Sequence, residues 1–231
     1  MNHSVLISTS SFGKLDETPI NQLKSNGCNI TLNPYKRTMT EAEISELIQD
    51  HDFLIAGTEP LTESVLKQAK KLKGISRCGI GMNNVDSTAA DKLGILLANT
   101  PDAPTMAVAE LTLGLILNVL RKVSHMNSEL KQGHWNKAFG TLLTGKVIGL
   151  IGFGRIGQAV AQLLTPFNVT ILAYDPFIEK TQQIVQFVDL QQLLQEAHII
   201  SAHTGSDEPL ITKENAHLIK NGAYFFNTSR A

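Results

Sequence analysis

The chain has 231 residues, enough for one or two domains, and its 42% of hydrophobic residues can form an extended core. Its formal net charge is −1 and its Lys and Arg residues are scattered, which excludes the basic footprint of a nucleic-acid-binding protein. The longest apolar stretch, residues 111–120, is shorter than the roughly 20 residues that cross a bilayer. Cys28 and Cys78 lack metal-type spacing, so we expect two free, buried thiols in a soluble, cytoplasmic protein without a metal site.

Short apolar runs alternate with segments of helical spacing in the first part of the chain. The runs that predict strands are residues 5–8, 29–32, 53–56 and 74–78. The segments that predict helices are residues 19–24, 41–49 and 62–72. Thr40 and Glu43 have the spacing of a capping box, and Thr62 marks the start of the third helix. Strands that alternate with helices predict a parallel, doubly wound α/β sheet.

An internal boundary follows at residues 99–105, where two prolines stand among polar turn formers. A long apolar helix is expected at 106–121, and a more polar helix continues to about residue 131. The second part repeats the α/β alternation. Its predicted strands are residues 147–151, 169–174, 184–188, 198–202 and 223–227, and its predicted helices are 158–164, 190–196 and 213–218.

A glycine motif of the form G-x-G-x-x-G joins the strand at 147–151 to the following helix. Gly152 permits the tight turn, Gly154 lets the backbone approach a pyrophosphate, and Gly157 brings helix and strand together. The N–H groups at the start of the new helix would then hold the phosphates. The alternative is an ordinary strand-to-helix turn whose glycines serve packing alone, but the full strand, helix and strand context favours a dinucleotide site.

An acidic residue, Asp175, ends the next strand, eighteen residues after Gly157. A carboxylate in this place accepts hydrogen bonds from the adenosine ribose hydroxyls and repels a 2′-phosphate. The only cation just beyond it is Lys180, with Glu179 beside it. The motif therefore predicts NAD rather than NADP as the cofactor.

Several motifs, in this order, resemble the D-isomer-specific 2-hydroxyacid dehydrogenases, and most closely their phosphoglycerate dehydrogenase-like branch. They are the sequences at 77–86 (RCGIGMNNVD), 99–103 (NTPDA), 107–110 (AVAE), 152–157 (GFGRIG), 203–204 (HT) and 227–230 (NTSR). The resemblance implies a flavodoxin-like substrate domain at 1–98 and a Rossmann-type NAD-binding domain at 99–231, with an active site in the cleft between them. The helix at 106–121 would be the hinge and, as in relatives, would contribute to a homodimer interface.

The resemblance also implies roles for individual residues. Hydride transfer between NAD and a small 2-hydroxy or 2-oxo acid needs a fixed carboxylate and a base for the hydroxyl proton. The turn Gly79-Ile80-Gly81 would hold the carboxylate through its N–H groups, although a plain strand-ending turn is equally consistent with the local sequence. Arg230 would be the catalytic arginine. The residues implied to contact NAD are Gly152, Gly154, Arg155, Ile156, Gly157, Asp175, Thr204, Thr228 and Ser229.

Two features depart from the family or leave alternatives open. Asn83 stands where many relatives have Asp, and His203 has at least as strong a structural as a catalytic interpretation. The general acid/base histidine of the family and its glutamate follow the arginine motif, in segments that these 231 residues do not contain. We therefore expect a dehydrogenase truncated at its C-terminus, with 3-phosphoglycerate as one candidate substrate. The alternatives are an inactive NAD-binding regulator or scaffold and a non-functional gene fragment.

Overall fold

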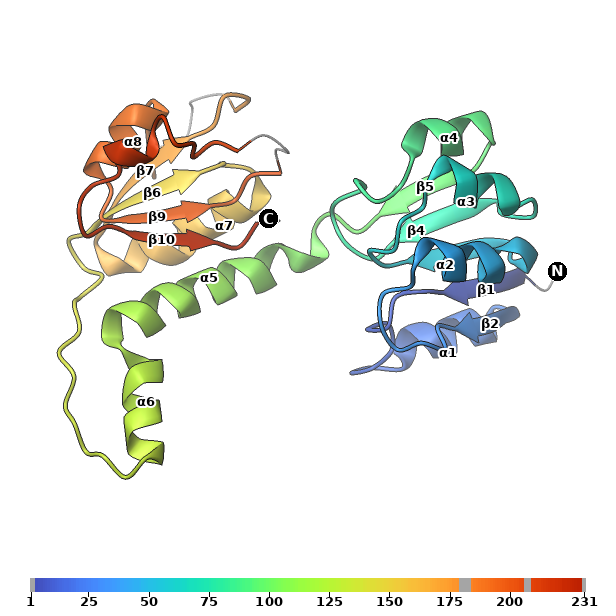
Figure 1. The fold of residues 1–231 in the computed structure, drawn as a ribbon, viewed down its shortest axis with the longest axis horizontal. Coiled ribbons are helices and arrows are strands. Elements are labelled where there is room, and N and C mark those ends of the chain that lie inside the picture. The colour runs from blue at the N-terminus through green and yellow to red at the C-terminus, as the bar shows by residue number, and fades with distance from the viewer. Residues whose placement is uncertain (1–2, 179–183, 206–208, 230–231) are drawn as a thin grey trace. The chain divides into compact units, whose positions relative to one another are not determined.

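The computed structural model describes residues 3–178, 184–205 and 209–229, and it divides the chain into two compact units. Unit 1 comprises Met1–Ala103 and unit 2 comprises Pro104–Ala231. Each unit has one five-stranded parallel sheet with helices packed on it (Figure 1). The division predicted between residues 98 and 99 falls within a strand of unit 1, Leu96–Asn99, which pairs with its neighbour Gly74–Arg77.

Unit 1 has the strand order β2-β1-β3-β4-β5, which is the order of the flavodoxin-like fold. Its strands are β1 (His3–Ile7), β2 (Cys28–Leu32), β3 (Phe53–Ala56), β4 (Gly74–Arg77) and β5 (Leu96–Asn99). Its helices are α1 (Thr18–Ser25), α2 (Glu41–Leu47) with the 3-10 turn η1 (Ile48–Asp50), α3 (Glu63–Gln68) and α4 (Ser87–Lys92). The sequence did not predict α4 or β5, which are only six and four residues long.

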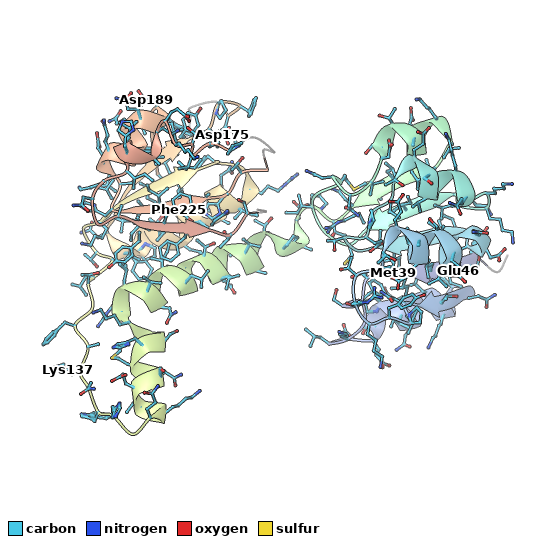
Figure 2. The ribbon with its side chains drawn as sticks, viewed as in Figure 1. Met39, Glu46, Lys137, Asp175, Asp189 and Phe225 are labelled. Atoms are coloured by element: carbon cyan, nitrogen blue, oxygen red, sulfur yellow. The ribbon has the colours of Figure 1, made fainter. Side chains whose placement is uncertain are left out.

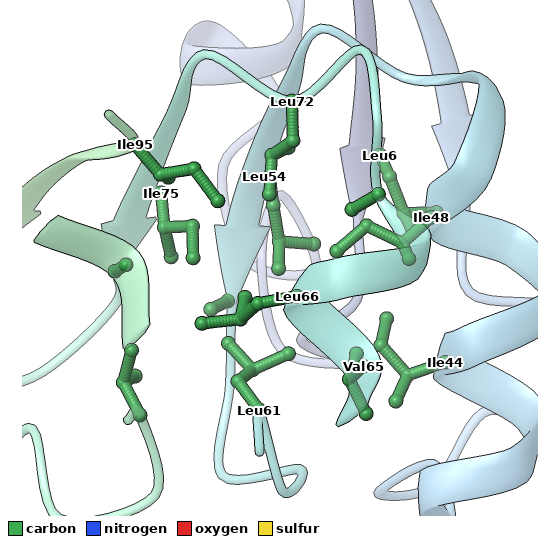
Figure 3. Close-up of a cluster of buried hydrophobic side chains, with 14 of the residues drawn as sticks. Leu6, Ile44, Ile48, Leu54, Leu61, Val65, Leu66, Leu72, Ile75 and Ile95 are labelled. Carbon is green, nitrogen blue, oxygen red and sulfur yellow. The ribbon is translucent and has the colours of Figure 1, made fainter. Parts of the chain in front are cut away.

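The core of unit 1 lies between its sheet and the helices α2, α3 and α4 (Figure 3). Leu6 and Leu54 project from neighbouring strands onto Ile44 of α2 and Leu66 of α3, and each of these side chains is at most 1% exposed. The predicted helix starts are confirmed. Thr40 and Glu43 form the capping box of α2, and the Thr62 hydroxyl accepts a hydrogen bond from the Val65 N–H at the start of α3.

Unit 2 has the strand order β10-β9-β6-β7-β8. When its strands are numbered from β6 and the order is read from β8, this becomes 3-2-1-4-5, the first five strands of the Rossmann order 3-2-1-4-5-6. Its strands are β6 (Val147–Ile151), β7 (Thr170–Tyr174), β8 (Gln186–Phe187), β9 (Ile199–Ala202) and β10 (Tyr224–Asn227). Its helices are α5 (Ala103–Arg121), α6 (Val123–Lys131), α7 (Arg155–Leu164) and α8 (Leu190–Glu196), with the 3-10 turns η2 (Thr165–Phe167) and η3 (Ala216–Leu218). The helix predicted at 213–218 is thus wrong, because only a 3-10 turn forms there.

Both faces of the sheet in unit 2 are covered. One face packs on α5 and α7 through residues such as Ile116 and Val160, and the other packs on α8 through Leu193 and Leu194. Strand β10 forms one edge of the sheet, and its Phe225 is 46% exposed (Figure 2). These two layers of helices hold the carboxyl ends of β6, β7 and β9 in fixed positions.

Helix α5 is, by length and composition, the one helix in the described part of the chain that could cross a membrane. The same helix has a clear packing role, because it buries Ala109, Thr112, Ile116 and Leu120 in unit 2. Of the cysteines, Cys28 and Cys78 are both free, as predicted. The expectation that both are buried is wrong, because Cys28 is only partly buried and Cys78, directly after β4, is exposed.

Candidate functional site

The glycine motif forms a tight turn between β6 and α7. Gly152 has φ +90°, and a Cβ there would lie 2.7 Å from the carbonyl oxygen of His203. A Cβ on Gly157 would lie 2.3 Å from the carbonyl oxygen of Gly152. Gly154 is the N-cap of α7, and among the described residues, its two chain neighbours apart, no atom lies within 4 Å of the position its Cβ would take. The first and third glycines are therefore needed for packing, whereas the second leaves open space at the helix N-terminus.

Asp175 follows β7, and backbone groups fix its carboxylate in place (Figure 2). Its Oδ2 accepts a hydrogen bond from the Phe153 N–H at 2.8 Å, and its Oδ1 accepts one from the Phe177 N–H at 2.9 Å. Each carboxylate oxygen has a second lone pair for another donor. The acid is thus oriented before any ligand binds, as an acceptor for a pair of vicinal hydroxyls should be.

A cavity of about 630 Å³ opens beside the glycine turn. The residues that line it are Gly152, Gly154, Tyr174, Asp175, Pro176, Phe177, His203, Thr204, Gly205 and Leu210. An open helix N-terminus at one wall and a carboxylate at another fit the phosphates and the ribose of a dinucleotide. The described residues contain no group of three or more His, Cys, Asp or Glu residues that could hold a metal ion.

Some of the residues predicted to contact NAD line the cavity, and others do not. Gly152, Gly154, Asp175 and Thr204 line the cavity. Of the other motif residues, Arg155 is exposed at the first position of α7 and Ile156 packs on the core of unit 2. Tyr174, Pro176 and Phe177 were not predicted, although their position around Asp175 was a signal that could have identified them. For Leu210 the sequence offers no such signal.

Other interactions engage the residues that follow β10. The hydroxyl of Thr228 lies 3.1 Å from the hydroxyl of Thr112 and 3.2 Å from Nδ1 of His203. The Ser229 hydroxyl donates to Oδ1 of Asn227 at 2.6 Å. Arg230, Glu179 and Lys180 lie outside the described residues.

The predicted substrate turn lies in unit 1, directly after β4. Gly79 has φ +142°, and its N–H donates to the Thr100 hydroxyl at 2.7 Å. The Gly79 N–H is therefore already engaged, which departs from the predicted three-amide turn. In the part of the chain that the structure describes, the N–H groups of Ile80 and Gly81 donate to no protein acceptor, so these two amides remain for a ligand.

His203 lies at the cavity wall, directly after β9. Burial lowers the pKa of its imidazole from the usual 6.5 to about 4. At neutral pH the ring is therefore uncharged, with one nitrogen that donates and one that accepts. This state suits a positioning or binding role better than a cationic one.

Comparison with known proteins supports the predicted family and fold. The family model of the NAD-binding domain of D-isomer specific 2-hydroxyacid dehydrogenases matches residues 113–231, just over half of the chain. Hydroxypyruvate reductase of Thermotoga maritima is 39% identical over 194 residues, which are 81% of this chain and 63% of that protein. D-3-phosphoglycerate dehydrogenase of Methanocaldococcus jannaschii is 39% identical over 203 residues, 83% of this chain and 38% of that protein.

Solved structures of relatives have the same fold. The crystal structure of NAD⁺-bound 3-phosphoglycerate dehydrogenase from Entamoeba histolytica is 25% identical, with a TM-score of 0.81 over 100% of this chain and 72% of that one. The chain thus spans less than two thirds of the length of the curated relatives named above. The predicted family, fold class and NAD cofactor are confirmed. The chain belongs to the D-isomer specific 2-hydroxyacid dehydrogenase family and contains its NAD-binding domain.

Proposed function

We propose that this protein is an NAD-dependent oxidoreductase that transfers a hydride between NAD and the CH–OH group of a small D-2-hydroxy acid. One observation supports this most directly. Within an NAD-binding domain of this family, the carboxylate of Asp175 is held by two backbone N–H groups at the wall of a cavity beside the glycine turn. The T. maritima relative is named for hydroxypyruvate and the M. jannaschii relative for 3-phosphoglycerate, so both acids are candidate substrates.

Each part of the cofactor cavity has a task in this proposal. NAD supplies the carbon that accepts or releases the hydride. Gly154 keeps the N-terminus of α7 open for the pyrophosphate, whose charge the N–H groups there stabilise. Asp175 accepts hydrogen bonds from the adenosine ribose and disfavours a 2′-phosphate by charge repulsion. Phe177, which is 93% exposed and lines the cavity, offers an apolar surface for the adenine.

The substrate groups belong to the motifs that the sequence identified. The amides of Ile80 and Gly81 would bind the substrate carboxylate, and Arg230 would bind carboxylate and carbonyl oxygen together and polarise the carbonyl. The general acid/base pair of the family, a histidine and a glutamate, would come from outside the 231 residues of this sequence. This pair contributes roughly 10²–10⁴-fold in rate. These 231 residues alone should therefore still bind NAD, but they should turn over substrate more slowly by about that factor than a protein that contains the pair.

Calorimetric titration with NADH tests the cofactor half of this proposal. We expect saturable binding that Gly154→Val abolishes, because the side chain would fill the open space at the start of α7. Gly114→Val is the matched control, since Gly114 lies on α5 and its Cβ position is likewise open to the rest of the described chain outside its own helix. Equal NADH affinity of the wild type and Gly154→Val would contradict the proposal.

Turnover is the second test. NADH oxidation, followed by its absorbance, is measured with glyoxylate, hydroxypyruvate and 3-phosphohydroxypyruvate as 2-oxo acids. Oxidation with one of them would identify the substrate class. Tight NADH binding without oxidation of NADH in the full-length protein would instead favour the NAD-binding regulator.

We also propose that two copies form a homodimer through the arm of unit 2, defined as α6 and residues 132–146 (Figure 1). The arm exposes large apolar side chains, with Val123 at 52%, Trp135 at 87% and Phe139 at 83%. Such a concentration of exposed apolar groups is typical of a protein interface. Sedimentation should give a dimer that Trp135→Ser with Phe139→Ser dissociates, while Phe177→Ser, at an exposed phenylalanine outside the arm, leaves it intact. A wild-type monomer would contradict the proposal.

A cytoplasmic location is the remaining part of the proposal. The two cysteines are free, as is usual for proteins of a reducing compartment. Helix α5 is apolar, but it buries Ala109, Ile116 and Leu120 in the core of unit 2. Cell fractionation of the natural host should place the protein in the soluble fraction, and recovery with the membranes would contradict this.

A further inference from the structure

The turn that follows β4 is hydrogen-bonded to two successive residues at the end of β5. Asn99 is the last residue of that strand, and Thr100 follows it. The Thr100 N–H donates to the Gly79 carbonyl oxygen at 3.1 Å, and the Thr100 hydroxyl accepts from the Gly79 N–H at 2.7 Å. The Asn99 side-chain amide donates to the Ile80 carbonyl oxygen at 2.6 Å. One segment thus binds two consecutive carbonyl groups of the turn.

These two carbonyl groups determine where the next two N–H groups point. A trans peptide unit is planar, so its C=O and its N–H point in opposite directions. The Gly79 carbonyl shares a peptide unit with the Ile80 N–H, and the Ile80 carbonyl shares one with the Gly81 N–H. Because the two carbonyls are bound by Thr100 and Asn99, both N–H groups point away from that segment. Within the described part of the chain neither N–H donates to a protein acceptor, so both can bind a ligand.

A positive charge lies beside the same turn. The Arg77 side chain donates to the Cys78 carbonyl oxygen at 2.5 Å, and a Cβ on Gly79 would lie 1.4 Å from Nη1 of Arg77. Gly79, Ile80 and Gly81 are all partly exposed, so a small molecule can reach the turn. Two outward N–H groups beside a cation favour an anion, and a carboxylate has two oxygens that can each accept from one N–H.

We propose that Asn99 is a positioning residue for the substrate. By holding the Ile80 carbonyl, its side chain directs the Gly81 N–H towards the carboxylate of a small 2-oxo or 2-hydroxy acid. The Thr100 N–H does the same for the Ile80 N–H, and the Thr100 hydroxyl takes up the Gly79 N–H, so the turn has two donors for the ligand rather than three. The identity of the ligand rests on the proposed function, whereas the orientation of the two amides does not.

NMR of the ¹⁵N-labelled chain tests the orientation without a ligand. A hydrogen bond to a carbonyl oxygen polarises its peptide unit, so the ¹⁵N signal of the next residue shifts when that bond is lost. We expect the Gly81 ¹⁵N signal to move upfield in Asn99→Ala, because the Ile80 carbonyl loses its donor.

Asn26→Ala is the matched control for this measurement. Asn26 is also exposed in unit 1, and its side-chain amide donates to the Gln22 carbonyl oxygen at 2.7 Å, at the end of α1. This variant should leave the Gly81 signal in place. A Gly81 signal that moves no further in Asn99→Ala than in Asn26→Ala would overturn the proposal.

Titration of the same labelled chains with glyoxylate, at constant ionic strength, tests the ligand. In the wild type the amide signals of Ile80 and Gly81 should shift saturably. Loss of one neutral hydrogen bond should weaken this binding by about two- to twelvefold in Asn99→Ala, and Asn26→Ala should bind as the wild type does. Asn99→Asp keeps the shape of the side chain but loses the donor and adds a negative charge, so it should bind no more tightly than Asn99→Ala.

The outcomes separate this inference from the proposed function. Unchanged glyoxylate affinity in Asn99→Ala, or an equal loss in Asn26→Ala, overturns the inference alone, provided that the wild-type signals of Ile80 and Gly81 respond. A wild type in which neither signal responds overturns the substrate role of this turn in the proposed function, while the orientation of the Gly81 amide is still measurable. Urea unfolding should show similar stability losses in the two alanine variants, since each loses one exposed hydrogen bond.

Discussion

The two units both have a five-stranded parallel sheet, but they differ in strand order and in the turn that follows their first strand. In unit 2, β6 is followed by Gly152, and α7 begins at Arg155. In unit 1, β1 is followed by Ser8, and α1 begins only at Thr18. A tight glycine turn aims a helix N-terminus at the sheet edge, which a long polar loop does not do.

The chemical groups at the two turns also differ. In unit 1 the Ser8 hydroxyl contacts the carboxylate of Glu59, which is 1% exposed and also accepts from the Gly57 N–H at 3.0 Å. A buried carboxylate at this edge repels a pyrophosphate, whereas the corresponding edge of unit 2 presents open space and N–H groups. The difference shows that a doubly wound sheet alone does not specify a cofactor site, because the site depends on the residues at the strand ends.

The largest effect should come from adding a side chain within the glycine turn of unit 2. Gly157→Ala places a Cβ 2.3 Å from the Gly152 carbonyl oxygen, so backbone must move, and we expect a loss of about 3 kcal/mol in the free energy of unfolding. Gly114→Ala is the control, since its Cβ position on α5 is open and the change should stabilise by about 1 kcal/mol. Urea unfolding measures both. A Gly157→Ala protein as stable as the wild type would contradict the close packing of this turn.

Removing the carboxylate of unit 2 should have the next largest effect. Asp175→Asn weakens acceptors that now bond to Phe153 N–H and Phe177 N–H, and we expect about 10- to 150-fold weaker NADH binding with less discrimination against NADPH. Asp189→Asn is the matched control, because Asp189 also accepts from a backbone N–H, at the start of α8, and does not line the cavity (Figure 2). Calorimetry with both nucleotides measures this, and equal NADH affinities of the two variants would contradict it.

Mild acid should lower the stability of unit 2 before it lowers that of unit 1. The pKa of folded His203 is lowered to about 4, against about 6.5 when unfolded, so the unfolded chain binds more protons between these values. The contribution of His203 to the stability of unit 2 is complete above pH 6.5 and is lost as the pH falls through 4. Between pH 7 and pH 5 the loss should be about 2 kcal/mol.

Unit 1 should respond at lower pH. The hydrogen bond from Arg37 lowers the pKa of the Glu43 carboxyl to about 2, so the stability that Glu43 contributes persists until the pH falls below its unfolded value near 4.5. Unfolding of the wild type and His203→Gln at pH 7 and pH 5, with probes in each unit, measures the difference. An equal loss of stability of unit 2 in His203→Gln would show that His203 is not the titrating group.

The smallest effect should come from neutralising the acid of unit 1. Glu59→Gln replaces a charged acceptor of the Ser8 hydroxyl and the Gly57 N–H by a neutral one, and we expect a loss of about 1 kcal/mol in the free energy of unfolding. Glu46→Gln, at an exposed position of α2, should change it by less than about 0.5 kcal/mol (Figure 2). NADH affinity should be unaffected in both. A Glu59→Gln protein that binds NADH at unit 1 would show that the carboxylate alone excludes the cofactor there.

Local features of the sequence predicted much of the fold. Alternating apolar runs and capping signals such as Thr40 with Glu43 located most strands and helices, because these signals lie within a few residues of each other. Helix α4 and strand β5 were missed, and for β5 the reason is that Leu96 is 76% exposed at the sheet edge. A strand with one exposed edge needs less apolar sequence, so its pattern is weak.

The sequence by itself determined the cofactor and predicted the residues that bind it. Gly152, Gly154, Gly157 and Asp175 are close in the chain, and backbone geometry makes each residue type necessary at its spacing. Only the tertiary structure decided the state of His203. Its Thr228 contact spans 25 positions, and the Thr228 contact with Thr112 spans 116. Local patterns carry no information on such contacts, because the packing of α5 against β9 and β10 brings these side chains together.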